Sequence, residues 1–578
     1  MLRPMNPSRR RALPPALAIM PFLVVLSLLA SPIPLLAAST RYVSPSGADS
    51  GNCLNSATPC KTFTHAISQA VAGDTISAGV GTYTENVMVD RNLTLQGASA
   101  SSTILDGGAA GRVLIVLGGI SVVVSEMTIQ NGKVTGDVGA GILNHGTLTL
   151  TRVTVSKNHA SGGTAAANNG AGIYNAGTLT LTSSFVSRNQ AAGNGGGIYN
   201  GPSAVATLKD STVSQNIASG LESNGGGISN AATLTLKNVM VTGNEAPFSA
   251  GILNGGTATL SNVTFTHNNA SLLGGGFTNL FATATLTDVT FIGNSAELGG
   301  GMWNREATAT LTDVTFSGNA ASTSGGGWGG GLANDIDAHA TLARVTFSGN
   351  AASISGGGIY NDGATATLTD VTFTGNSASS GGGIYNHGGA IATLTNVTLA
   401  ANSAANGGGI FNNQASATLT NVTLSGNSAL NGGGIENSSG ASATLTNVTL
   451  SGNSASNGGG AIDTAGATLG LKNTIADSPS GANCSGPLTT QGHNLDSGDT
   501  CGFDTELKDQ INVDPKLKSL ASNGGFTQTH ALATSSPAID TGANGGCPAT
   551  DQRGVARPLD GNGDGNARCD IGAYEHQP

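Results

Sequence analysis

The chain has 578 residues, of which 88 are glycine, 4% are aromatic and 10% are charged. Its formal net charge is −10, which excludes the basic surface of a nucleic-acid-binding protein. So much glycine with so few aromatic residues argues against several compact globular domains and favours one elongated repeat structure with a thin core.

Residues 1–38 have the pattern of a signal peptide. Three arginines at positions 9–11 precede an apolar stretch over residues 16–36, and the small residues Ala37 and Ala38 follow. The sequence therefore predicts export, by the general secretory route or by the twin-arginine route that residues 8–13 resemble. An uncleaved anchor is the alternative, although prolines within the stretch weaken it as a spanning helix. After cleavage we expect no transmembrane span.

Residues 39–130 predict an N-terminal cap and the first coils of a repeat structure. Phe63, Ala66, Ile67, Ala70 and Val71 have the spacing of one face of a helix, and strand-like segments follow over residues 73–89 and 92–97. A short helix at this place would cover the open end of the first coil, whose core and strand edges would otherwise be exposed.

Residues 131–475 repeat one unit, GGGIYN…ATLTDVTFTGN, with a period near 26 residues and intervals from 24 to 31. Its apolar segments are short, rich in Thr and Val, and bounded by Gly and Asn, which is typical of strands. No segment has sustained helical periodicity, and the period is too short for a four-stranded propeller blade. The sequence therefore predicts an all-β, right-handed parallel β-helix of about 12 or more coils, with a short N-terminal capping helix and an irregular C-terminal cap.

One unit predicts the path of one coil. Leu368, Val371, Phe373 and Ile359 should point into the core, and Asp370 should form a corner. Equivalent residues of successive coils should stack at the strand spacing of about 4.8 Å. Asparagine tolerates left-handed turns and hydrogen-bonds nearby backbone, so we expect structural asparagine ladders. These ladders include Asn319, Asn350 and Asn376 at one turn, and Asn361 and Asn386 in the GGGIYN strand.

Residues 476–578 break the period and predict the last coil or coils and an irregular end region. The six cysteines lie in the two end regions, and an even number in an exported chain favours disulfides over zinc, because no C-x-x-C motif is present. The pairs expected from proximity in sequence are Cys53 with Cys60, Cys484 with Cys501, and Cys547 with Cys569.

One stretch of this end region has the spacing of a calcium loop. Oxygen-bearing side chains occur at every second residue from position 560, as at the start of an EF-hand loop, although the acid expected at the twelfth position is one residue early. A turn rich in Gly, Asp and Asn is the alternative. The candidate calcium ligands are Asp560, Asn562, Asp564, Asn566 and Asp570.

Several segments resemble known families. RYVSPSGAD, TPCKTFTHAISQAVAGDTI, GTYTENV and TLQG resemble the opening of pectin-lyase-like parallel β-helix proteins. The GGGI-x-N and F-x-x-N motifs resemble the repeat of polymorphic outer-membrane proteins. NGGFTQTHAL (523–532), SSPAIDTG (535–542), TDQRGVARP (550–558) and CDIGAYE (569–575) resemble the C-terminal region of bacterial choice-of-anchor surface proteins. The resemblance implies an exported protein at the cell surface, outer membrane-associated or released, that binds a polysaccharide or a surface protein of a host or neighbouring cell.

The pectin-lyase-like resemblance also leaves a carbohydrate-active enzyme, a polysaccharide lyase or glycoside hydrolase, as the alternative function. Hydrolysis needs two carboxyl groups facing one cleft. The corner position of the repeat accepts Asp and Asn alike, which is typical of a turn cap, and Arg152, Arg305 and Arg344 look isolated from acid clusters by their phase. We therefore assign no catalytic residue and no cofactor apart from the candidate calcium, and predict a non-enzymatic, adhesin-like protein. The corner acids are Asp210, Asp288, Asp313 and Asp370.

Specificity is expected where the repeat is broken. The longest coils cover residues 158–189 and 319–350, and Trp303 and Trp328 are expected to be exposed near the second of them. An exposed indole there would stack on a sugar ring. The disulfide-bearing ends are the other places where we expect specificity.

Overall fold

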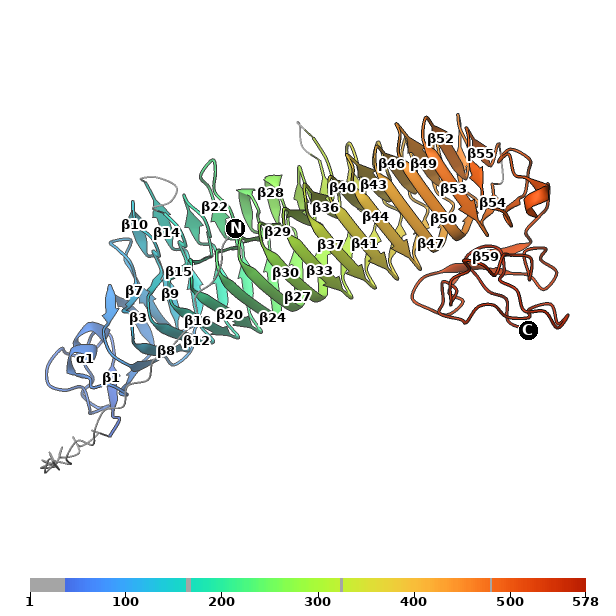
Figure 1. The fold of residues 1–578 in the computed structure, drawn as a ribbon. Helices are drawn as coiled ribbons and strands as arrows, with labels where there is room; N and C mark the ends of the chain where they lie inside the picture. The colour runs from blue at the N-terminus through green and yellow to red at the C-terminus, as the bar shows by residue number, and fades with distance from the viewer. Residues whose placement is uncertain (1–36, 163–167, 323–325, 479–480) are drawn as a thin grey trace, which may run out of the picture. The chain divides into compact units, whose positions relative to one another are not determined.

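The computed structural model describes residues 37–162, 168–322, 326–478 and 481–578. Residues 38–578 form one compact unit, in which successive coils lie side by side as a parallel β-solenoid (Figure 1). This architecture confirms the predicted fold class. The predicted signal peptide lies almost entirely outside the described residues. None of the described helices is long and apolar enough to span a membrane.

Three sheets run along the coils and contain 31, 16 and 9 strands. The 16-stranded sheet, which receives the GGGIYN strands, consists of β4 (Val87–Val89), β7 (Leu114–Val116), β11 (Ile142–Asn144), β15 (Ile173–Asn175), β19 (Ile198–Asn200), β23 (Ile228–Asn230), β26 (Ile252–Asn254), β29 (Phe277–Leu280), β32 (Met302–Arg305), β36 (Leu332–Asp335), β40 (Ile359–Asp362), β43 (Ile384–His387), β46 (Ile410–Asn413), β49 (Ile435–Ser438), β52 (Ile462–Ala465) and β55 (Cys484–Ser485).

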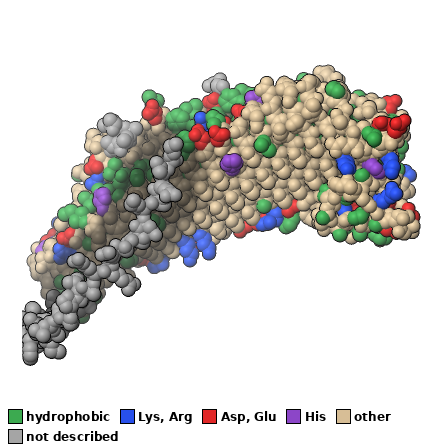
Figure 2. All heavy atoms as spheres, in the orientation of Figure 1, with side chains coloured by type: hydrophobic (Ala, Val, Ile, Leu, Met, Phe, Trp, Pro, Cys, Tyr) green, Lys and Arg blue, Asp and Glu red, His purple; other side chains and the backbone are tan. Residues whose placement is uncertain are grey.

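The 31-stranded sheet receives one long strand or two short strands from each regular coil. Its strands in the later coils are β41 (Thr365–Thr369), β42 (Thr372–Thr374), β44 (Ile391–Thr395), β45 (Thr398–Ala400), β47 (Ser416–Ser425), β50 (Ser442–Ser451), β53 (Thr468–Lys472) and β54 (Ile475–Asp477). The 9-stranded sheet includes β25 (Glu245–Phe248) and β28 (Asn269–Leu273). Figure 2 shows that uncharged polar side chains and backbone make up most of the visible face of these coils.

The predicted capping helix is α1 (Phe63–Gln69), and Thr62 caps its first turn. Phe63 and Ile67 are buried, and the Phe63 ring packs edge-on against Tyr83 with ring centroids 5.0 Å apart. The helix contacts the first strands of the solenoid. It therefore covers apolar surface at the start of the coils, as its amphipathic spacing predicted.

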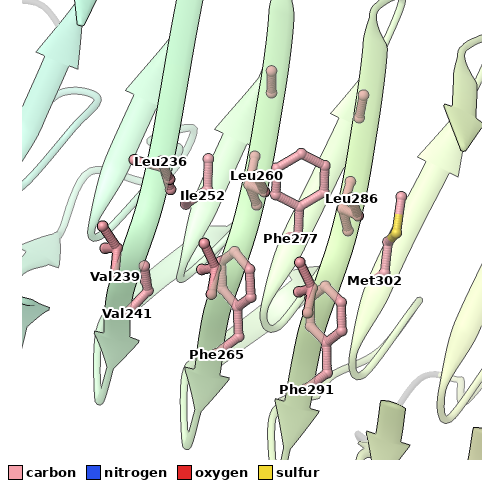
Figure 3. Packing of buried hydrophobic residues seen from close by; sticks show 14 of the residues in the cluster. Leu236, Val239, Val241, Ile252, Leu260, Phe265, Phe277, Leu286, Phe291 and Met302 are labelled. Carbon is pink, nitrogen blue, oxygen red and sulfur yellow. The ribbon is translucent and has the colours of Figure 1, made fainter. Parts of the chain in front are cut away.

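Identical residues stack along the solenoid core. Leu368 lies opposite Leu394 in the next coil. Five phenylalanine rings stack nearly parallel with centroids 4.7–4.8 Å apart, which is the spacing of neighbouring strands. They are Phe265, Phe291, Phe316, Phe347 and Phe373; Figure 3 shows the first two beside the leucine column. A repeat of one coil therefore generates the whole core.

Two columns of buried asparagines hold the turns together. Asn376 donates from its backbone N–H and its Nδ2 to Asn402 Oδ1, at 3.0 and 2.9 Å, and from Nδ2 to Phe347 O at 3.0 Å. In the second column, Asn361 Nδ2 donates to Asn386 Oδ1 at 2.7 Å. Each amide thus satisfies polar groups that the thin core would otherwise bury without partners. Asn319 and Asn350 continue the first column.

The triple glycine serves two different needs. Gly356 has φ +69°, a conformation that residues with a side chain rarely adopt. Gly358 lies against the phenylalanine column, because a Cβ there would be 2.7 Å from Phe373 Cδ1 and 2.6 Å from Gly383 O. The motif therefore follows from backbone bending and from close approach of neighbouring coils.

Disulfides close the two end regions. The structure pairs the cysteines as the sequence predicted, and no free cysteine remains among the described residues. The bonds join Cys53 to Cys60, Cys484 to Cys501 and Cys547 to Cys569.

Residues 513–578, which we call the C-terminal cap, pack against the outer side of the last coils, beside β47 and β50 (Figure 1). Asn447 Nδ2 donates to Asp570 O at 3.0 Å and to Gly572 O at 3.1 Å. Thr423 Oγ1 donates to Gln552 Oε1 at 2.6 Å. The cap therefore forms hydrogen bonds with polar side chains on the outer surface of the coils, between residues more than 120 positions apart in sequence.

Charged groups fill the interior of the C-terminal cap. Arg557 Nε lies 3.1 Å from Glu575 Oε2, and both side chains are fully buried. A second pair, Arg553 Nη2 and Asp551 Oδ2, lies at 2.6 Å and is nearly as buried. Removing one partner of such a pair would leave an uncompensated buried charge. The two strands of the cap, β59 (Leu517–Ala521) and β60 (Thr529–Leu532), pair antiparallel.

Candidate functional site

The outward side chains of the 16-stranded sheet form the candidate site. In each I-x-N-y unit the Ile and Asn point into the core, so the residues at x and y point outward, because successive residues of a strand face opposite sides. These outward residues change from coil to coil. We call those of β32, β36, β40, β43, β46, β49 and β52 the outer row. They are Trp303, Arg305, Ala333, Asp335, Tyr360, Asp362, Tyr385, His387, Phe411, Asn413, Glu436, Ser438, Asp463 and Ala465.

Aromatic rings and hydrogen-bonding groups alternate at the centre of the outer row. Tyr360 stacks on Tyr385 at 5.7 Å between centroids, and Tyr385 lies 5.4 Å from Phe411. Asp362 accepts a hydrogen bond from Tyr360 Oη at 2.8 Å and interacts with His387 Nδ1 at 2.9 Å. Burial raises the pKa of Tyr360 and of Tyr385, so both phenols stay neutral hydrogen-bonding groups. Tyr360 and Tyr385 are stacked on one another and half-buried, and Phe411 is buried, so this centre presents ring edges beside fixed polar groups.

An ion pair links β32 and β36, the two strands that precede this centre in the outer row. Arg305 Nη1 lies 3.6 Å from Asp335 Oδ2, and its guanidinium lies 5.7 Å from the centroid of the Trp303 ring. Burial raises the pKa of Asp335; Arg305 opposes this effect and Asp362 adds to it. Arg305 and Asp335 are opposite one another in the register of neighbouring strands. The sequence-based expectation that Arg305 is isolated was therefore wrong.

The other two arginines are also paired. Arg344 donates two hydrogen bonds to Asp313, at 2.6 and 2.7 Å, and holds the pKa of that exposed carboxyl below its usual value. Arg152 pairs with Glu126. The expectation failed because partners 26 to 31 residues apart in sequence occupy neighbouring coils. Both pairs lie at the corner of the repeat, away from the outer row.

Two carboxyl groups adjoin at the far end of the outer row. Glu436 lies opposite Asp463 of the next strand. Glu436 is 9% exposed, and its Oε2 has no hydrogen-bond partner among the described residues. Burial, and then the charge of Asp463, raise the pKa of Glu436 to about 7; burial also raises the pKa of Asp463. A carboxyl group of this kind is protonated in weakly acidic solution and can then donate a hydrogen bond.

A mostly apolar cavity of about 330 Å³ adjoins the Trp303 end of the outer row. β25 and β28 form one wall, and β26, β29 and β32 form the floor. The hydroxyl oxygens of Ser249 and Thr278, two of the lining residues, are buried and have no hydrogen-bond partner among the described residues. The apolar lining comes from Phe248, Leu253, Leu273, Leu280 and Trp303.

The two tryptophans are less accessible than the sequence indicated. Trp303 is 4% exposed and Trp328 is half-buried, so the expectation that both are exposed was wrong for Trp303. Parts of the two longest coils, residues 163–167 and 323–325, lie outside the described residues. The candidate site lies mostly within regular coils, although one of its strands, β36, belongs to the long coil over residues 319–350. An alignment of successive I-x-N-y units, compared at positions x and y, would have identified the residues of the candidate site.

The candidate calcium ligands are divided between two environments. Asp560, Asn562 and Asp564 lie in one exposed loop and accept hydrogen bonds from its own backbone N–H groups. Asn566 belongs to the same exposed loop. Asp570 is buried among the charged groups of the C-terminal cap, and burial raises its pKa to about 7. Calcium binding by this loop therefore stays a prediction.

A second metal candidate arises from the structure. Among the described parts of the chain, the group of Cys, His and acidic side chains close enough to share a metal ion consists of Cys53, Cys60 and His65. Its two sulfur atoms form a disulfide, which removes them as thiolate ligands. The N-terminal end region therefore contains a disulfide at the cysteines for which zinc binding was the alternative.

The fold and the outer row define a parallel β-solenoid with a specialised lateral face. The family profile of the Chlamydia polymorphic membrane protein repeat matches residues 344–362, 370–387 and 447–465. The chain therefore contains repeats of this type, as the sequence motifs indicated. A comparison with curated protein sequences found no similar protein.

Solved structures with a similar fold are only distantly related in sequence. Pectate lyase Pel9A is 12% identical, with 93% of this chain and 96% of that chain covered and a TM-score of 0.23. Pectin methylesterase PemA from Erwinia chrysanthemi is 12% identical, covering 49% and 80%, with a TM-score of 0.21. The A-module of mannuronan C-5 epimerase AlgE6 from Azotobacter vinelandii is 10% identical, covering 73% and 90%, with a TM-score of 0.23.

Proposed function

We propose that this protein is an exported surface protein that binds a polysaccharide along the outer row without cleaving it. The observation that carries the proposal is the column of Tyr360, Tyr385 and Phe411 beside Asp362 and His387. The exposed edges of Tyr360 and Tyr385 offer apolar contact to sugar rings, and the fixed polar groups beside them bind hydroxyls. Successive coils present these groups at the strand spacing, which suits a linear polymer.

The surface location rests on two independent features. The repeats match the Chlamydia polymorphic membrane protein repeat. Three disulfides in the end regions are typical of a protein that folds outside the cytoplasm. Protease treatment of intact cells tests it: we expect the chain to be cleaved without lysis, and protection until lysis would contradict surface display. A released protein would instead be found in the medium.

The central carboxylates of the outer row support binding without cleavage, because neighbouring side chains already contact them. Asp362 is hydrogen-bonded by Tyr360 and interacts with His387, and Asp335 is paired with Arg305, whereas a general acid or base needs an oxygen that reaches the substrate. A glycoside hydrolase is the second candidate, because the free oxygen and raised pKa of Glu436 beside Asp463 are properties of a general acid.

A polysaccharide array with the mature chain tests binding, and a reducing-end assay on each bound polysaccharide tests cleavage. We expect retention of at least one polysaccharide, no new reducing ends, and at least about tenfold weaker binding after Tyr385→Ala. The matched control is Tyr199→Ala, because Tyr199 stacks on Tyr174 in an earlier coil outside the outer row. Product release that Glu436→Gln abolishes would favour the hydrolase. Retention of a cell-surface protein but no glycan would overturn the proposal.

A further inference from the structure

We propose that a cavity between the last coils and the C-terminal cap binds a phosphate monoester. The cavity has a volume of about 280 Å³. The first two of its lining residues precede the cap and the other four belong to it, so the cavity forms where the two parts dock. The lining residues are His493, Lys508, Gly542, Ala543, Asn544 and Arg568. None of them belongs to the outer row, so this second site does not rest on the proposed function.

The lining of this cavity contains basic side chains and no acidic one. Lys508 and Arg568 are charged at neutral pH, and His493 lines the same cavity. In the part of the chain that the structure describes, neither Lys508 nor Arg568 is paired with a carboxylate, unlike Arg553 and Arg557 of the cap. Acidic residues outnumber basic ones between positions 472 and 575, so this concentration of positive charge is local. An anion in the cavity would offset the repulsion between the two cations.

Hydrogen bonds fix His493 between the last coil and the cap. Its backbone N–H donates to Leu507 O at 3.2 Å, which holds it beside Lys508. Its ring Nδ1 lies 2.7 Å from Thr541 O. A carbonyl oxygen only accepts, so Nδ1 carries the proton, and Nε2 is the ring nitrogen left for a ligand. The histidine side of the cavity is therefore positioned before any ligand binds.

The backbone that carries Arg568 is fixed in the same way. Asn544 Nδ2 donates to Ala567 O at 3.2 Å, and Asn544 Oδ1 accepts from Cys569 N at 2.8 Å. Gly542 N donates to Cys569 O at 2.8 Å. The residues on both sides of Arg568 are thus held by residues that line the cavity. A ligand would have to order only the exposed ends of the basic side chains, which lowers the cost of binding.

A phosphate monoester fits this charge better than other common anions. It carries a charge of about −1.5 to −2 at neutral pH and three acceptor oxygens. Arginine binds phosphate through two parallel hydrogen bonds, and lysine binds it as a point charge. A carboxylate, a sulfate ester or a phosphate diester has a single negative charge and would leave one cation uncompensated. Because Lys508 and Arg568 are exposed, the group esterified to the phosphate can extend into solvent. A phosphorylated polysaccharide and a phospholipid headgroup therefore share the required chemistry.

Calorimetry of the mature chain at constant ionic strength tests the inference with glycerol phosphate as the monoester, dimethyl phosphate as the diester and acetate as the carboxylate. We expect glycerol phosphate to bind at least tenfold more tightly than either of the others. Lys508→Gln combined with Arg568→Gln should weaken it at least tenfold, while the melting temperature stays within about 2 °C, because neither side chain has an ion-pair partner to lose. The matched control is Lys516→Gln with Lys518→Gln, which removes the same charge from exposed cap positions outside the cavity. This control should change the affinity by less than twofold.

Two larger probes distinguish the sources of the phosphate. Phosphatidylcholine vesicles with and without phosphatidic acid present the monoester on a lipid, and a phosphorylated mannan presents it on a polysaccharide. The probe that binds the wild type but not the Lys508/Arg568 variant identifies the source, and binding of glycerol phosphate alone identifies a soluble phosphate ester. Equal affinity for the three small anions, equal affinity of wild type and the Lys508/Arg568 variant, or no binding of glycerol phosphate would overturn the inference. Each of these results would leave glycan binding along the outer row intact.

Discussion

The corner position of the repeat has different partners in two regions of the solenoid. One region is the coils covered by the C-terminal cap, and the other is the coils that the cap does not cover, which we call the free coils. In the free coils the corner residue is Glu, Arg, Ser, Asp or Asn, and Arg152 pairs there with Glu126 at the exposed surface. In the covered coils every corner is asparagine, at positions 396, 421, 447 and 473. Asn421, Asn447 and Asn473 donate their Nδ2 hydrogens to carbonyl oxygens of the cap.

This difference separates two roles of one corner residue. In both regions the corner residue has a positive φ, so the left-handed turn alone accepts Asp and Asn alike. Of these two residues only asparagine can donate to a carbonyl oxygen, because an ionised aspartate has no donor, so asparagine in the covered coils fits docking of the cap. A position that looks indifferent across the whole repeat is therefore specific within one region.

The largest expected effect is loss of a buried charge partner in the C-terminal cap. Arg557→Met leaves Glu575 buried without its cation, and we expect the cap to be destabilised by about 3–5 kcal/mol. Limited proteolysis should then release the cap while the coils stay resistant. Arg152→Met, which breaks the exposed pair with Glu126, is the control and should change stability by less than about 1 kcal/mol. Equal effects of the two variants would contradict the comparison.

Exchange of the corner residues should affect the two regions differently. Asn447→Asp replaces a donor to two carbonyl oxygens by a carboxylate that repels them, and should weaken docking of the cap by about 2–3 kcal/mol. Asp370→Asn at a free corner should stay within about 0.5 kcal/mol. Hydrogen exchange of residues 540–575 measures the docking. Unchanged protection in the Asn447 variant would show that the cap does not depend on the corner amides.

The periodic part of the fold could be predicted because one unit fixes it. Leu368, Phe373 and Asn376 each meet copies of themselves in neighbouring coils, so inward direction and stacking follow from a single repeat. The capping helix followed from the spacing of Phe63 and Ile67 for a similar reason, since amphipathicity is a local signal. The disulfides followed from the confinement of cysteines to the ends.

The aperiodic contacts could not be predicted in this way. Arg305 and Asp335 pair because they are opposite one another in neighbouring strands, which becomes visible only when variable positions are aligned coil by coil. The contact of Gln552 with Thr423 joins residues 129 positions apart through polar groups that have no period. Trp303 lines a cavity together with Phe248 and Leu273, which come from wall strands of preceding coils. Sequence reasoning therefore found the scaffold and missed the lateral interactions on its surface.

The 16-stranded sheet should also contribute a pH dependence, through Glu436 of β49, on a different face of the coils from the one that the cap covers. The pKa of Glu436 is raised from 4.5 to about 7, so between these values the folded state binds more protons than the unfolded state, and stability falls as pH rises. Glu436→Gln removes this contribution, and should stabilise the coils by about 1–2 kcal/mol at pH 8 relative to pH 5. Melting curves of wild type and variant at both pH values measure it. An identical pH dependence of the two proteins would contradict the raised pKa.

The smallest expected effect compares two threonines that are opposite one another in neighbouring coils. Thr398 Oγ1 donates to Gln528 O at 2.6 Å and accepts from Gln552 Nε2 at 2.8 Å. Thr372 is the residue opposite Thr398 in the preceding coil. Thr398→Val removes both hydrogen bonds and should weaken docking of the cap by about 1 kcal/mol. Thr372→Val keeps the strand propensity of a half-buried residue and should stay within about 0.5 kcal/mol. Hydrogen exchange of residues 523–532 measures the difference. A larger effect of the Thr372 variant would contradict the prediction, because it would show that the cap also depends on the preceding coil.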